Sequence, residues 1–140
     1  MPKNKKIRVI LDTNLFISFL IGKQLKNLKS LIVLNSIELI FSEQIIQELK
    51  LVGDRPKFDK YFTTANLKDL IELIYLIGQV YQLDNVANIC RDPKDDFLLE
   101  LADRSKADFL VSGDKDVLAI KNYKKTKIIT LTEFDKILRK

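Results

Sequence analysis

Short apolar runs alternate along the chain with longer segments of helical periodicity. The run Ile7–Leu11 is rich in β-branched residues and stops at the polar residues Asp12–Asn14. This pattern predicts a buried strand that runs into a turn. Further strands are predicted over four short segments: Glu38–Phe41, Val80–Leu83, Asp108–Val111 and Lys127–Thr130.

Apolar residues three and four positions apart predict helices between these strands. The clearest helix is Asn66 to about Val80, whose apolar residues fall on one side. Ser42 is placed to cap a second helix, which contains Ile45, Ile46 and Leu49. The other predicted helices run from Leu15 to about Asn35, follow a polar turn at Arg91–Asp96 around Pro93, cover Asp114–Ile120, and follow a capping box formed by Thr132 and Asp135.

Strands that alternate with helices favour a parallel sheet with helices on both faces. We therefore expect an α/β fold, a three-layer α/β/α sandwich whose central parallel sheet has about four to five strands. A chain of 140 residues corresponds to one domain, here 1–140 with a core over about 7–138. In such sheets, ligand sites form at the carboxyl ends of the strands.

The composition excludes several kinds of chemistry. The chain has no histidine, which excludes Ser-His-Asp and Cys-His nucleophile systems and zinc sites that contain histidine. The single Cys90 excludes an internal disulfide and a cysteine-cluster metal site. An enzyme activity would have to use carboxylates, Lys, Tyr or a bound ion.

The net charge is +5, and many basic residues lie near the two ends of the sequence. This balance suits a polyanionic partner, but solvated basic edges would look the same. The apolar region Leu15–Ile21 is too short to span a bilayer and is not a secretory signal. With one unpaired cysteine, we expect a cytoplasmic protein without a membrane partner.

Acidic residues fall where a sheet of this kind forms its site. Asp12 directly follows the first predicted strand, and Asp114 follows the strand Asp108–Val111. Glu48 lies at the edge of the apolar stripe of the helix that Ser42 begins. Each of these acids alone is explained by a turn, a helix cap or a solvent-facing helix position.

A fourth acid begins the helix that follows Pro93. Leu98, Leu99 and Ala102 are three, four and seven residues after Asp95, so Asp95 shares their face. Asp96 points about 100° away from Asp95, and we expect its side chain to be more exposed.

The four acids together suggest a metal site. Clustered carboxylates stay ionised together only when a cation neutralises them. Hard oxygen ligands without histidine favour Mg²⁺ or Mn²⁺ over Zn²⁺. A water molecule held by such an ion can attack a phosphodiester, and a basic surface could bind the rest of a nucleic-acid backbone.

Four segments occur in an order and spacing typical of one family. They are Arg8–Asn14 (RVILDTN), Phe41–Leu49 (FSEQIIQEL), Arg91–Ala102 (RDPKDDFLLELA) and Ala107–Asp116 (ADFLVSGDKD). In these segments the chain resembles the PIN-domain family, and the resemblance extends from about Ile7 to Leu138. It is closest to prokaryotic single-domain toxin components of toxin–antitoxin systems.

The resemblance implies a metal-dependent endoribonuclease with a Rossmann-like sheet and Mg²⁺ or Mn²⁺ as cofactor. The acids that would hold the metal and its activated water are Asp12, Glu48, Asp95 and Asp114. The implied accessory residues are Asn14 at the Asp12 turn, Ser112 as a hydrogen-bond donor, Asp116 as a further acid, and Asp96 as the alternative to Asp95. The resemblance also implies an RNA substrate, a homodimer and an antitoxin protein whose tail occupies the site.

Other functions stay open at this point. A nuclease directed at DNA, or a non-catalytic RNA-binding or antitoxin-docking module, could use the same fold. An aspartyl-phosphate phosphatase is disfavoured because Asp12 is followed by Thr13-Asn14 and not by the second acid of an Asp-x-Asp motif. A nucleotide-binding regulator is disfavoured because no glycine-rich phosphate loop occurs.

Overall fold

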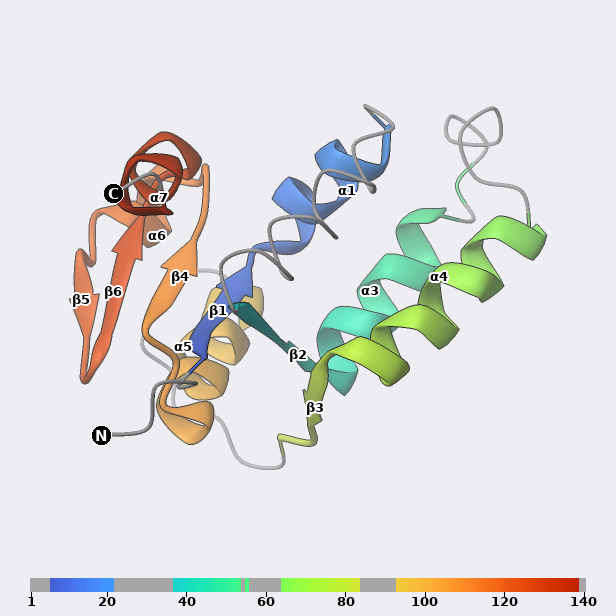
Figure 1. The fold of residues 1–140 in the computed structure, drawn as a ribbon, viewed down its shortest axis with the longest axis horizontal. Helices are drawn as coiled ribbons and strands as arrows, with labels where there is room; N and C mark the ends of the chain where they lie inside the picture. The colour runs from blue at the N-terminus through green and yellow to red at the C-terminus, as the bar shows by residue number, and fades with distance from the viewer. Residues whose placement is uncertain (1–5, 22–36, 54, 56–63, 84–92, 139–140) are drawn as a thin grey trace.

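The computed structural model describes residues 6–21, 37–53, 55, 64–83 and 93–138 (Figure 1). The elements follow in the order β1 (Ile7–Leu11), α1 (Thr13–Ile21), β2 (Ile37–Ser42), α3 (Glu43–Gly53), α4 (Thr64–Ile77), β3 (Gln79–Tyr81), α5 (Pro93–Ser105), β4 (Phe109–Val111), α6 (Lys115–Leu118), β5 (Asn122–Tyr123), β6 (Thr126–Ile129) and α7 (Leu131–Leu138).

The strands form a six-stranded sheet in the order β3-β2-β1-β4-β6-β5. All neighbouring strands are parallel except β5, which pairs antiparallel with β6 through Asn122 and Tyr123. The predicted α/β fold class is therefore confirmed. The sixth strand was not predicted, because a two-residue edge strand is too short to produce an alternating pattern.

The order of the strands also places the helices. From β1 the chain moves outward to β2 and β3, and α5 then carries it back across to β4 on the other side of β1. Since crossovers between parallel strands are right-handed, α1, α3 and α4 belong on one face and α5 on the other. Figure 1 agrees: α3 and α4 lie side by side, and α5 lies behind β1.

The core is built from the central strands and the helices packed on them. Val9 and Ile10 of β1 and Leu110 of β4 are fully buried, as expected for parallel strands covered on both faces. The ring of Phe16 in α1 packs edge-on against Phe41 in β2, with 5.6 Å between the ring centroids. The described helices include none long and apolar enough to cross a membrane.

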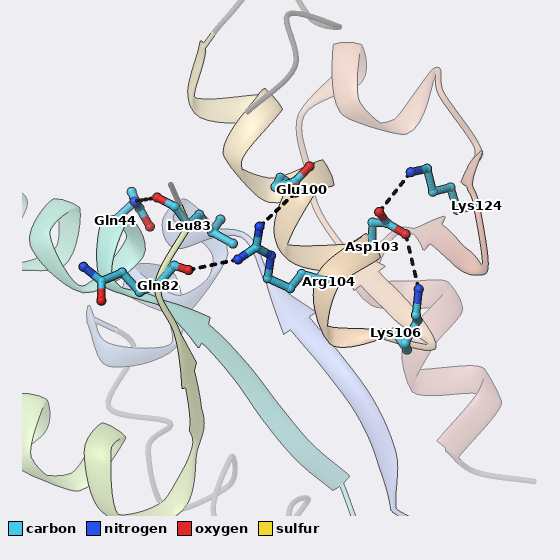
Figure 2. A network of polar contacts seen from close by, with 8 residues as sticks. All are labelled: Gln44, Gln82, Leu83, Glu100, Asp103, Arg104, Lys106 and Lys124. Atoms are coloured by element: carbon cyan, nitrogen blue, oxygen red, sulfur yellow. Dashed lines mark hydrogen bonds and ion pairs between the residues drawn. The ribbon is translucent and has the colours of Figure 1, made fainter. Parts of the chain in front are cut away.

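Polar side chains of α5 tie this helix to its neighbours (Figure 2). Arg104 pairs with Glu100 at 3.6 Å and donates to the carbonyl of Gln82, just after β3. On the other side, Asp103 pairs with Lys124 at 2.9 Å and with Lys106 at 3.6 Å. The hydrogen bond with Lys124 lowers the pKa of the Asp103 carboxyl below its usual range. Lys124, one of the basic residues near the C-terminal end, is thus paired within the protein.

Two helix starts differ from the prediction. Pro93 opens α5, so Pro93–Asp96 forms the first helical turn and not a separate polar turn. Proline suits this position because its missing N–H has no partner in the first turn of a helix. The helix predicted from Leu15 to about Asn35 begins two residues earlier, at Thr13. It is described only to Ile21, as α1, and residues 22–36 lie outside the described part.

The capping box of α7 begins at Thr130, and its prediction at Thr132 with Asp135 was wrong. The N–H of Glu133 donates to Thr130 Oγ1 at 3.1 Å, and the N–H of Thr130 donates to Glu133 Oε1 at 3.1 Å. The predicted spacing of three residues is right, but the pair lies two positions earlier, because β6 ends at Ile129.

This capping box predicts a pH-dependent contribution to stability. Hydrogen bonds from the Thr130 N–H and hydroxyl lower the pKa of Glu133. A lowered pKa in the folded state stabilises the fold above the ordinary glutamate pKa, and this stabilisation is lost as the pH falls through the lowered value. We expect wild type to be more stable than Glu133→Gln at neutral pH, with the difference shrinking as the pH falls from neutral through the lowered pKa of Glu133. Urea unfolding across this range measures it, and a difference independent of pH would contradict the prediction.

Candidate metal and nuclease site

The sheet has its topological switch point between β1 and β4. The chain leaves β1 towards β2 on one side, whereas β4 pairs with β1 on the other. In open α/β sheets, ligands bind in the crevice at the carboxyl ends of such a strand pair. Asp12 directly follows β1, and Ser112 to Asp114 directly follow β4. The two predicted strand-end acids therefore lie at the position where this topology forms a site.

A cleft of about 300 Å³ opens at this edge. Its lining comes from the residues that follow β1, one face of α3 and a residue beyond its end, the first turns of α5, and the turn after β4. The lining residues are Asp12, Thr13, Asn14, Gln44, Ile45, Glu48, Val52, Arg55, Phe97, Leu98 and Asp114. A second hollow of about 320 Å³ shares Asp12, Asn14 and Asp114 with it. Three of the four predicted ligand acids thus face one cleft.

Asp12 is held in place by the sheet and by its own turn. Its N–H donates to the Val111 carbonyl at 3.0 Å, which continues the pairing of β1 with β4. Its Oδ2 accepts from the Ser112 hydroxyl at 2.8 Å, and its Oδ1 accepts from the Asn14 N–H at 3.3 Å. A carboxylate has about four acceptor positions, so each oxygen keeps capacity for a further ligand.

Ser112 joins the two acid-bearing turns. Its side chain is only 1% exposed, and its hydroxyl both donates to Asp12 and accepts from the Asp114 N–H at 3.0 Å. The Ser112 N–H bonds to the Ile129 carbonyl at 3.0 Å, so the β4–β6 pairing fixes its backbone. One buried hydroxyl therefore sets both the orientation of Asp12 and the path of the chain into Asp114.

Asp114 is exposed and caps the short helix α6. Its Oδ1 accepts from the Asp116 N–H at 2.8 Å, and this arrangement leaves the carboxylate at the edge of the cleft. Asp116 is exposed, and its side chain is not among those that line the cleft. Within the described residues, Asp116 acts on Asp114 through its backbone N–H.

Glu48 reaches the cleft from α3. Ser42 caps this helix by accepting the Ile45 N–H at 3.1 Å, which confirms the predicted cap. Gln44, Glu48 and Val52 are each four residues apart and line the cleft from one helical face. Gln44 also donates to the carbonyl of Leu83, which ties α3 to the segment after β3 (Figure 2).

The two neighbouring acids of α5 are placed differently from the prediction. Asp95 lies in the first turn of α5, and its side chain is outside the described part. Asp96 was expected to be more exposed, but it is only 4% exposed and has interaction partners. That expectation was wrong because Leu98, Leu99 and Leu101 are all buried, so the buried face of α5 is wider than the predicted stripe.

Several residues that line the cleft were not predicted. Gln44 could have been found by counting one helical turn back from Glu48. No sequence pattern distinguishes Phe97 as a cleft residue, because an aromatic residue beside Leu98 is typical of a hydrophobic core. Arg55 follows the end of α3, where helical periodicity no longer predicts direction. It is the one cationic side chain among the described residues that line the cleft.

The donor set of the cleft suits a hard divalent cation. Among the described side chains, no three acids lie close enough together to enclose one ion. Mg²⁺ does not need such a cage, because it usually binds through one or two carboxylates and completes its shell with water and substrate phosphates. Asp12, with its orientation fixed by Ser112, and the neighbouring Asp114 fit that manner of binding.

Comparison with known proteins identifies the family of the chain. A family model described as PIN domain matches residues 8–116, which include every strand-end acid described above. The chain belongs to the PIN domain family. PIN domains are generally metal-dependent nucleases, so membership supports a nuclease function that uses divalent metal ions.

Two similar proteins extend the comparison. The PIN-domain chain is 31% identical over 129 residues to the uncharacterized protein MJ1680 of Methanocaldococcus jannaschii, covering 86% of this chain and 79% of the relative. The solved structure of the PIN domain endonuclease Utp24 is similar with a TM-score of 0.57 and 16% identity, covering 89% of this chain and 84% of that one. The second likeness shows the shared fold.

Proposed function

We propose that this chain is a Mg²⁺- or Mn²⁺-dependent endoribonuclease that hydrolyses RNA phosphodiesters in the cleft at the switch point. The observation that carries the proposal is that Asp12, Glu48 and Asp114, from three separate elements, line one cleft. The resemblance of the sequence to ribonuclease toxin components supports RNA as the substrate, and the net charge of +5 suits a polyanion.

The residues that line or support the cleft would have separate roles. Asp12 and Asp114 would bind the ion directly. Glu48, and Asp95 from the first turn of α5 with Asp96 as the alternative, would hold the ion through its activated water. Ser112 would keep Asp12 turned to the ion, and the backbones of Asn14 and Asp116 would fix the two acid-bearing turns. When bound, the ion would polarise the phosphodiester and activate water for hydrolysis.

The biological setting is proposed from the same resemblance. We infer a toxin of a toxin–antitoxin pair that acts in the cytoplasm as a homodimer, with an antitoxin protein as its partner.

The chain has no histidine, so the leaving oxygen would receive its proton from water near the ion and not from an imidazole.

A panel of substrates tests the proposed reaction. Purified protein is incubated with single-stranded RNA, structured RNA and single-stranded DNA, each with Mg²⁺, Mn²⁺ or EDTA. We expect cleavage of RNA that requires the ion. Cleavage confined to DNA would replace the proposal by a DNA-directed nuclease, and RNA binding without cleavage under any ion would replace it by a binding module.

A further inference from the structure

The cleft contains a positive charge that the proposed metal site does not use. Arg55 lines the cleft together with the three acids, and within the described residues it forms no ion pair. Its N–H donates to the Val52 carbonyl at 3.1 Å, which holds the residue just beyond the last turn of α3.

An aromatic ring lines the same cleft. Phe97 packs partly against the core but is only half-buried, and with Val52 and Leu98 it forms an apolar part of the cleft wall. The cleft thus combines acids, an apolar wall with an aromatic ring, and a guanidinium group. Grooves that bind a nucleic-acid strand combine a cation for the backbone with an aromatic side chain for a base.

On the basis of the nuclease function above, we propose that Arg55 and Phe97 form a nucleotide-binding subsite beside the metal-binding acids. Arg55 binds a backbone phosphate next to the scissile one, since a guanidinium group fits phosphate oxygens in a bidentate way. Phe97 contacts a base of the same strand through its accessible ring surface. The subsite holds the strand so that the scissile phosphate lies at Asp12, Glu48 and Asp114.

Binding measured without metal tests this subsite separately from catalysis. The affinity for a short fluorescein-labelled single-stranded RNA of mixed sequence is measured by anisotropy in EDTA, over a range of salt concentrations. The variants are Arg55→Ala, Phe97→Leu and Lys50→Ala. Lys50→Ala is the matched control, because Lys50 is on α3 but about 200° around the helix from Glu48. Phe97→Leu keeps an apolar contact with the core.

Each variant has a different expected signature. Arg55→Ala should bind roughly tenfold more weakly than wild type, and the slope of log affinity against log salt should fall by about 0.7, the value for one phosphate contact on a single strand. Phe97→Leu should bind about fivefold more weakly with an unchanged salt slope, because stacking does not release counterions. Lys50→Ala should match wild type within about twofold. In Mg²⁺, the cleavage KM of Arg55→Ala should rise in proportion to its lost affinity.

RNA binding in EDTA tests the subsite, and cleavage with added ion tests the nuclease function. If Arg55→Ala or Phe97→Leu binds like Lys50→Ala, or if wild type does not bind RNA in EDTA, the subsite is overturned, whether or not RNA is cleaved. If RNA binding depends on Arg55 and Phe97 as expected but no ion supports cleavage, the subsite stands and the nuclease function falls.

Discussion

Asp12→Asn is expected to lower the rate of metal-dependent RNA cleavage by about a thousandfold or more, because a metal ligand at the reacting phosphate contributes several kcal/mol to transition-state stabilisation. The substitution keeps the shape of the side chain, and the Ser112 hydroxyl can still hydrogen-bond to it. The free energy of unfolding should therefore change by no more than about 1 kcal/mol. Initial cleavage rates and urea unfolding of both proteins measure the two effects.

The control for this prediction is Asp69→Asn. Asp69 is an exposed acid of α4, and it is not among the residues that line the cleft. The substitution removes the same charge, so its cleavage rate should equal that of wild type. Equal rates for Asp12→Asn and wild type would show that the cleavage does not use this cleft.

Ser112→Ala is expected to reduce both activity and stability. Loss of the hydroxyl frees the Asp12 carboxylate to rotate and removes the acceptor of the Asp114 N–H. Groups that orient metal ligands typically contribute 10- to 100-fold, so we expect a loss of roughly that size in cleavage rate and metal affinity. Two lost hydrogen bonds should cost about 1–2 kcal/mol of unfolding free energy. Calorimetric Mn²⁺ titration, cleavage rates and urea unfolding measure these quantities.

Ser105→Ala is the matched control for Ser112→Ala. Ser105 is also fully buried, but its hydroxyl has no hydrogen-bond partner within the described residues. Its removal should leave activity unchanged and unfolding free energy unchanged or raised by up to about 1 kcal/mol. A Ser112→Ala protein as active as Ser105→Ala would mean that Asp12 is positioned by the sheet alone.

Much of the fold could be predicted because its central elements have strong local patterns. The run Ile7–Leu11 is apolar except for Arg8, because the last three residues of β1 are buried between helices on both faces of the sheet. Asn66 to about Val80 was predicted as a helix and is α4, Thr64–Ile77, with boundaries within three residues. The strand β5 escaped prediction because its two residues are held by pairing with β6, which no local pattern encodes. Likewise, the cap of α7 depends on where β6 ends, which shifted it to Thr130.

The candidate site was predictable where chain topology alone decides position. Asp12 and Asp114 follow parallel strands, so their proximity at one sheet edge follows from the fold class. Asp96 was misplaced because helical spacing gives the direction of a side chain but not how much of the helix surface its neighbours cover. Arg55 was missed because a residue beyond a helix end has no periodicity, and only tertiary structure brings it to the cleft.

The most direct test of the central claim compares the initial rates at which wild type and Asp12→Asn cleave a single-stranded RNA. Each rate is measured in EDTA and again after excess Mg²⁺ is added back. We predict no cleavage in EDTA, full recovery with Mg²⁺ in wild type, and no recovery in Asp12→Asn. Cleavage that continues in EDTA, or that returns equally in both proteins, would contradict a metal-dependent nuclease built on Asp12.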